Sequence, residues 1–322
     1  MRAVVTGVAG FIGSTLARTL LEDTNNEVIG IDAFTDYYDV GLKQHNVQEI
    51  PSDRFTLVTG DINELPLSKV LRGSDVIFHL AGQPGVRRSW GTEFDHYTRH
   101  NINATQRLLE VAREIATLRA FVFASSSSVY GNAVRYPTSE LDRPAPLSPY
   151  GVTKLAAEHL CSLYAANFAV PTVSLRYFTV YGPRQRPDMA FNKFISAALD
   201  ARELRIYGDG TQIREFTHVS DIVRANLLAS QAGLEPGAVI NLSGGAAVSI
   251  NEVIDIVAAL HGSRPAVAYG KSLPGDVLRT GGDTSRAREL LDWRPLISIE
   301  EGLETEYAWL CGVRNQRLAS AS

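Results

Sequence analysis

The chain has 322 residues, of which 45% are hydrophobic and 20% charged, and this composition is typical of a folded globular protein rather than a disordered or fibrous one. The length suits one large α/β unit or two ordinary domains. A net charge of −4 does not suggest the basic surface that binding of nucleic acid requires. The chain has two cysteines, Cys161 and Cys311, which indicate neither a disulfide framework nor a zinc site.

The first residues already have the pattern of a strand, which leaves no room for a signal peptide. No apolar run approaches the ~20 residues that a membrane-spanning helix needs. We therefore expect a cytoplasmic protein with no membrane partner.

Short apolar segments alternate with segments of helical periodicity over the first half of the chain. The predicted strands are residues 2–7, 27–32, 54–61, 75–81 and 120–126, with a helix after the first strand and a long helix over 94–117. This alternation predicts the α/β class, with a Rossmann-type doubly wound parallel sheet covered on both faces.

The regular alternation of strands and helices ends beyond residue 176. A turn-rich GPRQRP segment, a helix at about 191–201 and a short RIYGDG turn are followed by mixed α and β structure. We expect a smaller C-terminal α/β domain laid over the carboxyl edge of the sheet. The predicted boundaries are 1–175 plus about 214–242 for the first domain, and about 176–213 plus 243–322 for the second.

The segment TGVAGFIGS (6–14) follows a strand and begins a helix, with Gly7, Gly10 and Gly13 in a G-x-x-G-x-x-G spacing. Such a turn lets the backbone approach a pyrophosphate and presents N–H donors at a helix N-terminus. Asp32 ends the second strand, where a carboxylate can accept hydrogen bonds from the adenosine ribose. Context and acid together predict a dinucleotide site.

NAD is favoured over NADP, because a carboxylate at Asp32 repels a 2′-phosphate and no arginine follows it in DAFTDYYD. Asp61 and Ile62, after the third strand, are placed to meet adenine. A turn-capping role for Asp61 is the alternative.

The segment SPYGVTK (148–154) places Tyr150 and Lys154 just inside a helix that Ser148 can cap and Pro149 can begin. The spacing of four residues puts both side chains on one helix face, so the ammonium can lower the tyrosine pKa toward the working range of a base. An isolated Tyr-x-x-x-Lys pattern usually marks only the solvent-exposed border of an amphipathic helix. Here it follows a dinucleotide motif and the serine-rich segment ASSSSVYG (124–131).

This combination resembles the extended short-chain dehydrogenase/reductase superfamily, whose members act on nucleotide sugars, and the match covers almost the whole chain. The resemblance implies a catalytic triad of Ser126, Tyr150 and Lys154, with Ser127 the alternative serine. It also implies that the first domain binds NAD, that the second binds the nucleotide sugar, and that a homodimer forms through the helices near 94–117 and 149–169.

The same resemblance implies further contacts in four segments, HLAGQPGVRRS (79–89), RYFTVYGPRQRPDMA (176–190), REFTHVSDI (214–222) and PGDV (274–277). The implied cofactor contacts, besides those named above, are Phe11, Ile12, Phe34, Lys43, Leu80, Ala81, Gln83, Asn101 and Tyr177. The implied substrate contacts are Gln83, Val86, Arg87, Ser127, Ser128, Thr179, Arg186, Met189, Phe191, Arg214 and Asp276. His79 and His218 lie in these segments without a second metal ligand in register, so we expect both to be structural and predict no metal site.

The serines also narrow the chemistry within the superfamily. The 4,6-dehydratases carry an Asp-Glu pair at the positions of Ser127 and Ser128, and the nucleotide-sugar decarboxylases carry a glutamate at the second of these. With neither acid present, a 4-keto intermediate is expected to take its hydride back on the other face, which is 4-epimerisation.

The substrate loop YFTVYGPRQRPDM resembles that of the UDP-glucuronate 4-epimerase family, with Thr179 and Arg186 at the positions that distinguish it from UDP-glucose 4-epimerases. An arginine fork suits a sugar carboxylate, whereas we expect Arg184 to be a solvated charge. UDP-glucose 4-epimerase, UDP-glucuronate decarboxylase, an NADH-releasing dehydrogenase and an NAD-sensing regulator remain alternatives. Uridine and thymidine donors are not distinguished.

Overall fold

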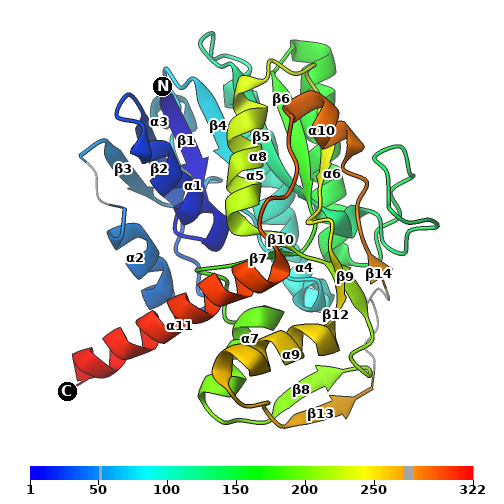
Figure 1. Cartoon of the computed structure of the whole chain (residues 1–322). Coiled ribbons are helices and arrows are strands. Elements are labelled where there is room, and N and C mark those ends of the chain that lie inside the picture. The colour runs from blue at the N-terminus through cyan, green and yellow to red at the C-terminus, as the bar shows by residue number, and fades with distance from the viewer. Residues whose placement is uncertain (51–52, 272–278, 322) are drawn as a thin grey trace.

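The computed structural model describes residues 1–50, 53–271 and 279–321 of the chain. Its main sheet has seven parallel strands in the order β11-β6-β5-β4-β1-β2-β3 (Figure 1). The strands are β1 (Arg2–Thr6), β2 (Glu27–Asp32), β3 (Phe55–Thr59), β4 (Val76–His79), β5 (Ala120–Ser126), β6 (Thr172–Tyr177) and β11 (Ala238–Leu242). The chain order reverses between β1 and β4, as in a doubly wound Rossmann sheet. The predicted fold class is confirmed.

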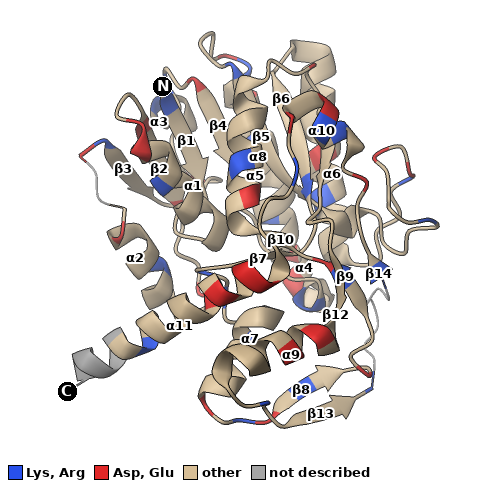
Figure 2. Cartoon of the chain, viewed as in Figure 1, with Lys and Arg blue, Asp and Glu red and all other residues tan. Residues whose placement is uncertain are grey.

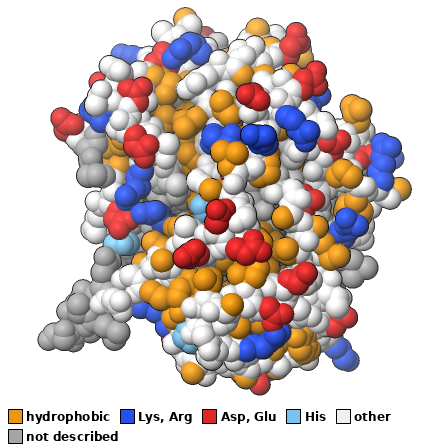
Figure 3. All heavy atoms as spheres, in the orientation of Figure 1, with side chains coloured by type: hydrophobic (Ala, Val, Ile, Leu, Met, Phe, Trp, Pro, Cys, Tyr) orange, Lys and Arg blue, Asp and Glu red, His pale blue; other side chains and the backbone are white. Residues whose placement is uncertain are grey.

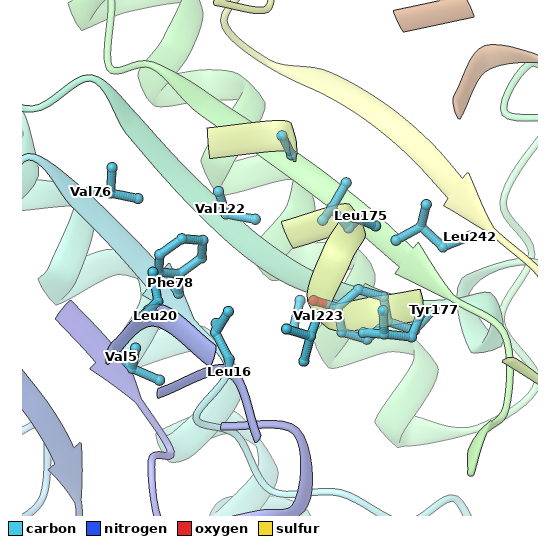
Figure 4. Packing of buried hydrophobic residues seen from close by; sticks show 14 of the residues in the cluster. Val5, Leu16, Leu20, Val76, Phe78, Val122, Leu175, Tyr177, Val223 and Leu242 are labelled. Carbon is cyan, nitrogen blue, oxygen red and sulfur yellow. The ribbon is translucent and has the colours of Figure 1, made fainter. Parts of the chain in front are cut away.

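Helices cover both faces of this sheet. One face carries α1 (Phe11–Glu22), α8 (Val219–Gln231) and α10 (Ser285–Leu291), and the other carries α3 (Leu67–Val70), α5 (Ala104–Ala112) and α6 (Pro149–Phe168). Successive strand side chains point to opposite faces, so in β1 Val5 packs toward α1 while Val4 packs toward the other layer. Figure 4 shows Val5, Phe78 and Val122 of three adjacent strands facing Leu16 and Leu20 of α1.

The predicted long helix over 94–117 is interrupted. The structure has α4 (Phe94–Tyr97), a π-helical turn η3 (Thr98–Asn103) and then α5, which ends at Ala112. Short 3₁₀ turns η1 (Arg87–Ser89) and η2 (Gly91–Glu93) precede α4. Single π turns inside helices are frequent at functional sites, and this one places Asn101 beside the crevice described below. Helical periodicity alone does not reveal such a turn.

The second lobe lies below the carboxyl edge of the sheet in the view of Figure 1. Its helices are α7 (Ala190–Leu199), α9 (Ile250–His261) and α11 (Ile299–Ala321), which enclose their own apolar core. Its strands are β8 (Leu204–Tyr207), β9 (Ile213–Glu215), β12 (Ala247–Ser249), β13 (Val267–Gly270) and β14 (Arg279–Thr280), and β7 (Val180–Tyr181) pairs with β10 (Thr217–His218) at the junction. The prediction of only a turn at RIYGDG was wrong, because its first residues form β8 against β13.

Packing crosses the predicted domain boundary, most clearly at α10. Ala287, Leu291 and Trp293 fall in the predicted second domain, yet they are buried in the same apolar cluster as α1 and α8. The indole N–H of Trp293 donates to the carbonyl oxygen of Asp221 in α8, at 2.9 Å. The two lobes therefore share buried structure, and α10 belongs with the sheet.

Charge is mixed over the surface. Acidic residues gather in the first half of α11, where Glu300, Glu301 and Glu304 are exposed (Figure 2). On the face drawn in Figure 3, basic and acidic side chains are interspersed. In the described part of the chain, no helix is long and apolar enough to cross a membrane. The cytoplasmic location stays a prediction.

Gly13 gives a test of how tightly α1 sits on the turn before it. A Cβ added at Gly13 would lie 2.2 Å from the carbonyl oxygen of Gly7, a backbone atom that cannot move aside cheaply. We expect Gly13→Ala to lower the free energy of unfolding by roughly 1–3 kcal/mol or more, measured by urea denaturation. Gly312→Ala in α11, where a Cβ meets nothing within 4 Å, is the control and is expected to be neutral or up to about 1 kcal/mol stabilising. Equal effects of the two would contradict the close approach.

Candidate active site

A crevice opens at the carboxyl ends of the main strands, where β1 and β4 separate. Ligands of open α/β sheets bind at this kind of switch point. Sixteen of the residues predicted from the sequence line it, namely Gly7, Gly10, Phe11, Ile12, Gly13, Asp32, Lys43, Asp61, Ile62, Leu80, Ala81, Gln83, Tyr150, Lys154, Tyr177 and Arg186. Segments from β1, β2, β3, β4, α6, β6 and the second lobe thus meet in one cavity.

The glycine-rich turn has the shape that a pyrophosphate needs. Gly7 has a φ of +71°, and a Cβ there would lie 2.9 Å from Cα of Ala81, so a larger residue would be both strained and crowded. Gly10 caps α1 without any side-chain hydrogen bond. The first N–H groups of α1 therefore face the crevice uncovered by a capping side chain, which suits an anionic group at the positive end of the helix.

Asp32 is held rigidly at the end of β2. Its Oδ2 accepts a hydrogen bond from the backbone N–H of Ala9 at 2.9 Å, and its Oδ1 accepts one from Phe34 at 2.8 Å. Two backbone donors fix the carboxylate in the cavity wall beside the glycine turn. A carboxylate has lone pairs left for ribose hydroxyls, so the residues present fit NAD.

Asp61 has the predicted turn-capping role, and its contact with adenine stays a prediction. It lines the cavity, and it also accepts a hydrogen bond from the backbone of Asn63 and an ion pair from Arg99 at 2.7 Å. Burial raises the pKa of Asp61, but the bonds from Asn63 and Arg99 outweigh burial and hold that pKa below its usual range. The carboxylate is therefore charged and committed mainly to structure.

The start of α6 is built as predicted. Ser148 accepts a hydrogen bond from the N–H of Gly151 at 3.1 Å, and Pro149 is the first helical residue. A Cβ at Gly151 would lie 2.5 Å from the carbonyl oxygen of Ser128. Only glycine allows this approach, which brings Tyr150 against the serine-rich end of β5.

Ser126, rather than Ser127, faces Tyr150. The Ser126 hydroxyl accepts the N–H of Ser128 at 3.1 Å, which begins the 3₁₀ turn η4 (Ser127–Val129). Burial raises the pKa of Tyr150 above its usual value, and a hydrogen bond with the Ser126 side chain and the charge of Arg186 offset only part of this rise. The predicted lowering of this pKa by Lys154 is therefore not seen in this structure. The geometry favours Ser126 as the serine of the predicted triad.

Lys154 is a buried ammonium one turn further along α6. Burial lowers its pKa to about 8. Within the described residues no carboxylate lies within ion-pairing distance of it, and its Nζ lies 4.6 Å from the centre of the Phe123 ring. The next acid on the helix, Glu158, is engaged elsewhere, because Arg176 donates to both of its carboxylate oxygens at 2.5 and 3.0 Å.

Asn101 supports the site through hydrogen bonds to residues around the cavity. It lies in the π turn, it does not line the cavity, and its amide accepts from the N–H of Gln83 at 2.7 Å and donates to the hydroxyl of Thr153 at 3.0 Å. The side chain thereby ties the loop after β4 to α6. Its contact with the cofactor stays a prediction, and the structure shows a positioning role.

Two tyrosines at the site were not predicted. Tyr37 lines the crevice, with the guanidinium groups of Arg88 and Arg186 at 5.1 and 5.8 Å from its ring centre. Tyr97 is fully buried, packs edge-on against Tyr150 and donates to the carbonyl oxygens of Pro84 and Gly85. Paired aromatic residues in FTDYYD were a usable signal for Tyr37, whereas Tyr97 resembles any core residue of a helix.

The arginines of the GPRQRP segment both differ from free surface charges. Arg184 was predicted to be solvated, and this was wrong: its side chain is 13% exposed and pairs at 2.5 Å with Glu49, just beyond α2 (Val40–Gln48). Arg186 lines the cavity with a side chain that is 19% exposed. Its Nε and Nη2 donate to the two carboxylate oxygens of Asp188 at 2.9 and 3.0 Å.

Several predicted contacts lie outside the cavity wall. The residues concerned are Phe34, Val86, Arg87, Ser126, Ser127, Ser128, Thr179, Met189, Phe191 and Arg214, and of these Ser126 still meets the cavity residue Tyr150 through its hydroxyl. Phe191 is corrected most clearly, because it is fully buried against Phe216 and Tyr181 in the second core, and its ring has no access to a substrate. Arg87 stacks over Tyr207 at 4.6 Å. Asp276 lies outside the described residues.

The two histidines are structural, as expected. His79 is fully buried between the hydroxyls of Thr6 and Thr105, at 2.8 and 2.9 Å, and burial lowers its pKa to about 3. His218 bonds to Ser220 at the start of α8. Among the residues that the structure describes, no group of three potential ligands could hold a metal ion.

The fold and the crevice define a nucleotide-sugar enzyme of the extended short-chain dehydrogenase/reductase class. Residues 3–243 match the model of the NAD dependent epimerase/dehydratase family, and the chain belongs to this family. It is 44% identical over 311 residues to the uncharacterized UDP-glucose epimerase YtcB of Bacillus subtilis, covering 96% of this chain and 98% of the relative. It is 38% identical over 313 residues to a UDP-glucuronate 4-epimerase of Thermodesulfobacterium geofontis, covering 95% of each.

Solved structures agree with these relatives. A UDP-glucuronic acid 4-epimerase from Bacillus cereus, in complex with UDP-glucuronic acid and NAD, superimposes with a TM-score of 0.94 at 44% identity, over 97% of this chain and 100% of the other. MoeE5 in complex with UDP-glucose and NAD gives a TM-score of 0.88 at 43% identity, over 98% and 100%. The predicted class is confirmed: the protein is an NAD-dependent nucleotide-sugar 4-epimerase, an isomerase.

The buried Lys154 ammonium predicts a pH-dependent stability. The pKa of Lys154 is lower in the folded protein than in the unfolded chain, so the unfolded chain binds the proton more tightly. The buried charge therefore destabilises the folded protein fully below pH 8. This destabilisation is lost as the pH rises from 8 to 10.5. We expect Lys154→Met to raise the free energy of unfolding at pH 7 by roughly 1–3 kcal/mol, a gain that shrinks toward pH 10.5. Denaturant melts at both pH values measure it. Exposed Lys69→Met is the control, and a less stable Lys154→Met protein at pH 7 would contradict the argument.

Proposed function

We propose that the protein interconverts UDP-glucuronic acid and UDP-galacturonic acid through a 4-keto intermediate. The observation that carries this proposal is the Arg186 guanidinium in the cavity wall, close enough to Tyr150 for its charge to offset part of the rise in the tyrosine pKa that burial causes. A cation at this place suits a sugar that carries an acid next to the reacting carbon. The UDP-glucuronate 4-epimerases among the relatives, and the Bacillus cereus complex with UDP-glucuronic acid, support the same substrate.

Tyr150 is the proposed general base and acid. It takes the proton from the C4 hydroxyl as the C4 hydrogen leaves as hydride, and it returns that proton when the hydride comes back on the other face of the sugar. NAD, when bound, supplies the hydride acceptor and donor. The Lys154 ammonium, with no carboxylate of its own, stabilises the phenolate, and Ser126 hydrogen-bonds the same sugar oxygen.

Arg186 and Thr179 are proposed to hold the sugar carboxylate. A guanidinium fork binds a carboxylate through two parallel charge-assisted bonds, and Arg186 is largely withdrawn from water. A neutral hexose offers no charge to this fork. Preference for the acid therefore arises from the pairing of a largely buried cation.

The serines after β5 are proposed to protect the acid. The 4-keto form of the substrate is a β-keto acid, which loses CO2 when its C5–carboxylate bond aligns with the carbonyl π system. Hydroxyls of Ser127 and Ser128 can bond the carboxylate and help to hold that bond near the carbonyl plane, whereas a glutamate would repel the acid. Both residues follow Ser126 directly in the turn η4, and this closeness to the proposed triad supports their assignment to the same end of the sugar.

One other substrate has specific support. YtcB is a UDP-glucose epimerase by name, and MoeE5 is seen with UDP-glucose as well as with UDP-glucuronic acid. The test is incubation with each UDP sugar, followed by NMR and mass spectrometry of the product. An epimerase gives a product of unchanged mass, and a decarboxylase gives a UDP-pentose. A dehydrogenase accumulates NADH, and a non-catalytic NAD sensor gives no product. Conversion of UDP-glucose but not UDP-glucuronic acid would overturn the proposal.

A homodimer remains a prediction. The α6 helix exposes Val152, Leu163 and Phe168, each about half accessible, which supports a second copy covering this helix. Sedimentation of the purified protein tests it.

Tyr150→Phe removes only the phenolic hydroxyl. We expect it to lower kcat by at least about 10²-fold and to leave NAD affinity unchanged, because the ring keeps its packing against Tyr97. Product NMR and calorimetric titration of NAD measure the two effects. Tyr269→Phe, at an exposed tyrosine in β13, is the matched control. Retained turnover in Tyr150→Phe would remove this residue from the reaction.

Arg186→Ala removes the proposed clamp. We expect weaker binding of UDP-glucuronic acid, and release of CO2 with a UDP-pentose or its 4-keto form, because the acid is no longer held in the plane of the ketone. Mass spectrometry and trapping of labelled CO2 measure this side reaction. Arg202→Ala, at an exposed arginine paired with Asp200, is the control. Loss of all activity without CO2 or pentose would count against the retention hypothesis.

A further inference from the structure

The edge of Arg186 that is proposed to hold the substrate is already filled by an acid of the protein itself. Asp188 binds the guanidinium side-on, with one carboxylate oxygen on Nε and the other on Nη2. This is the same two-bond geometry that a sugar carboxylate would adopt. The side chain of Asp188 is 37% exposed, whereas that of Arg186 is 19% exposed.

The loop does not need Asp188 for its backbone path. Gln185 accepts the N–H of Asn192 at 2.9 Å and donates to the carbonyl oxygen of Val180 at 3.2 Å. Asn192 in turn donates to the carbonyl oxygen of Gln185 at 2.9 Å. Arg184 is anchored on Glu49. Side-chain bonds of other residues therefore fix the chain on the N-terminal side of Arg186, and Asp188 acts on its guanidinium.

Two carboxylates cannot share one edge of a guanidinium without repelling each other. Of the two residues in this pair, Asp188 is the more exposed, so its carboxylate can turn toward water at little cost while the arginine stays in the cavity wall. A neutral hexose has no carboxylate that could replace Asp188 on Arg186. With such a sugar bound, Arg186 would keep Asp188 as its partner and would not become an unpaired charge.

We infer that Asp188 is a displaceable counter-ion of Arg186, which competes with the carboxylate of an acidic sugar and sets how strongly the enzyme prefers an acidic sugar to a neutral one. This inference rests on the proposed function. It assigns opposite effects on acid selectivity to the two residues of the pair: Arg186 strengthens the binding of acidic sugars, and Asp188 weakens it while it keeps the arginine paired in the free enzyme.

The test is the dissociation constant of UDP-glucuronic acid and of UDP-glucose for the NAD-loaded enzyme, measured by calorimetry. Asp188→Asn keeps the shape of the side chain and removes its charge. For a partly exposed ion pair we expect UDP-glucuronic acid to bind about fivefold more tightly, with UDP-glucose changed less than about twofold. Asp188→Ser is the second variant, with the same expectation. Asp36→Asn, an exposed acid in the loop after β2 that makes no ion pair with Arg186, controls for the loss of one negative charge near the site.

A double-variant cycle isolates the mechanism. In an Arg186→Ala background the Asp188→Asn effect should vanish, because the competition has no cation left to act on. Weaker or unchanged binding of UDP-glucuronic acid in Asp188→Asn, an equal change for both sugars, or a gain that persists without Arg186 would each overturn the inference. If the wild-type enzyme binds UDP-glucuronic acid but does not epimerise it, the proposed function fails, while tighter binding in Asp188→Asn would still support the counter-ion.

Discussion

The buried ion pair between Glu158 and Arg176 is the interaction on which the arrangement of the site depends. It joins α6 to β6, and the Ser125 hydroxyl at the end of β5 donates to the same carboxylate at 2.7 Å. A carboxylate that stays ionised in the interior needs a partner, and Glu158 has Arg176 as its partner rather than Lys154 one turn away. Among the described residues the ammonium of Lys154 thereby has no carboxylate as an ion-pair partner, and it faces the cavity. The pair also fixes the distance between α6 and the strand end that carries Ser126.

Several other charged groups in and around the crevice form ion pairs within the protein. Arg99 pairs with Asp61, Arg184 with Glu49 and Arg186 with Asp188. The two pairs on the substrate loop differ in character. The Arg184–Glu49 pair joins that loop to the segment after α2 and stabilises the loop. The Arg186–Asp188 pair joins two residues of the same loop, and the partial exposure of Asp188 allows its carboxylate to be exchanged for another one. If the substrate is the proposed acidic sugar, its charge replaces that of Asp188 on Arg186, and the site stays electrically balanced before and after the ligand binds.

Aromatic rings complete the site where hydrogen bonds do not reach. Tyr37 connects the cofactor side to Arg88 and Arg186, and Tyr97 supports both the loop after β4 and the ring of Tyr150. Both rings pack against residues far away in the chain. Their positions follow from the crossing of β2, α4 and α6 at the same edge of the sheet, which no local pattern in the chain specifies.

The sequence by itself determined those features that depend on short-range chemistry: the glycine turn before α1, the acid at the end of β2, the Ser148 cap and the Tyr150–Lys154 spacing. Each uses residues within a turn or two of one another, where backbone geometry decides the outcome. Only the tertiary structure decided which serine faces Tyr150, that Arg184 is braced by Glu49, that Phe191 belongs to a core and that Asp188 occupies the fork of Arg186. Those outcomes depend on competition among side chains for partners in three dimensions, and a charge or a ring in the sequence does not reveal which partner is close enough to bind it.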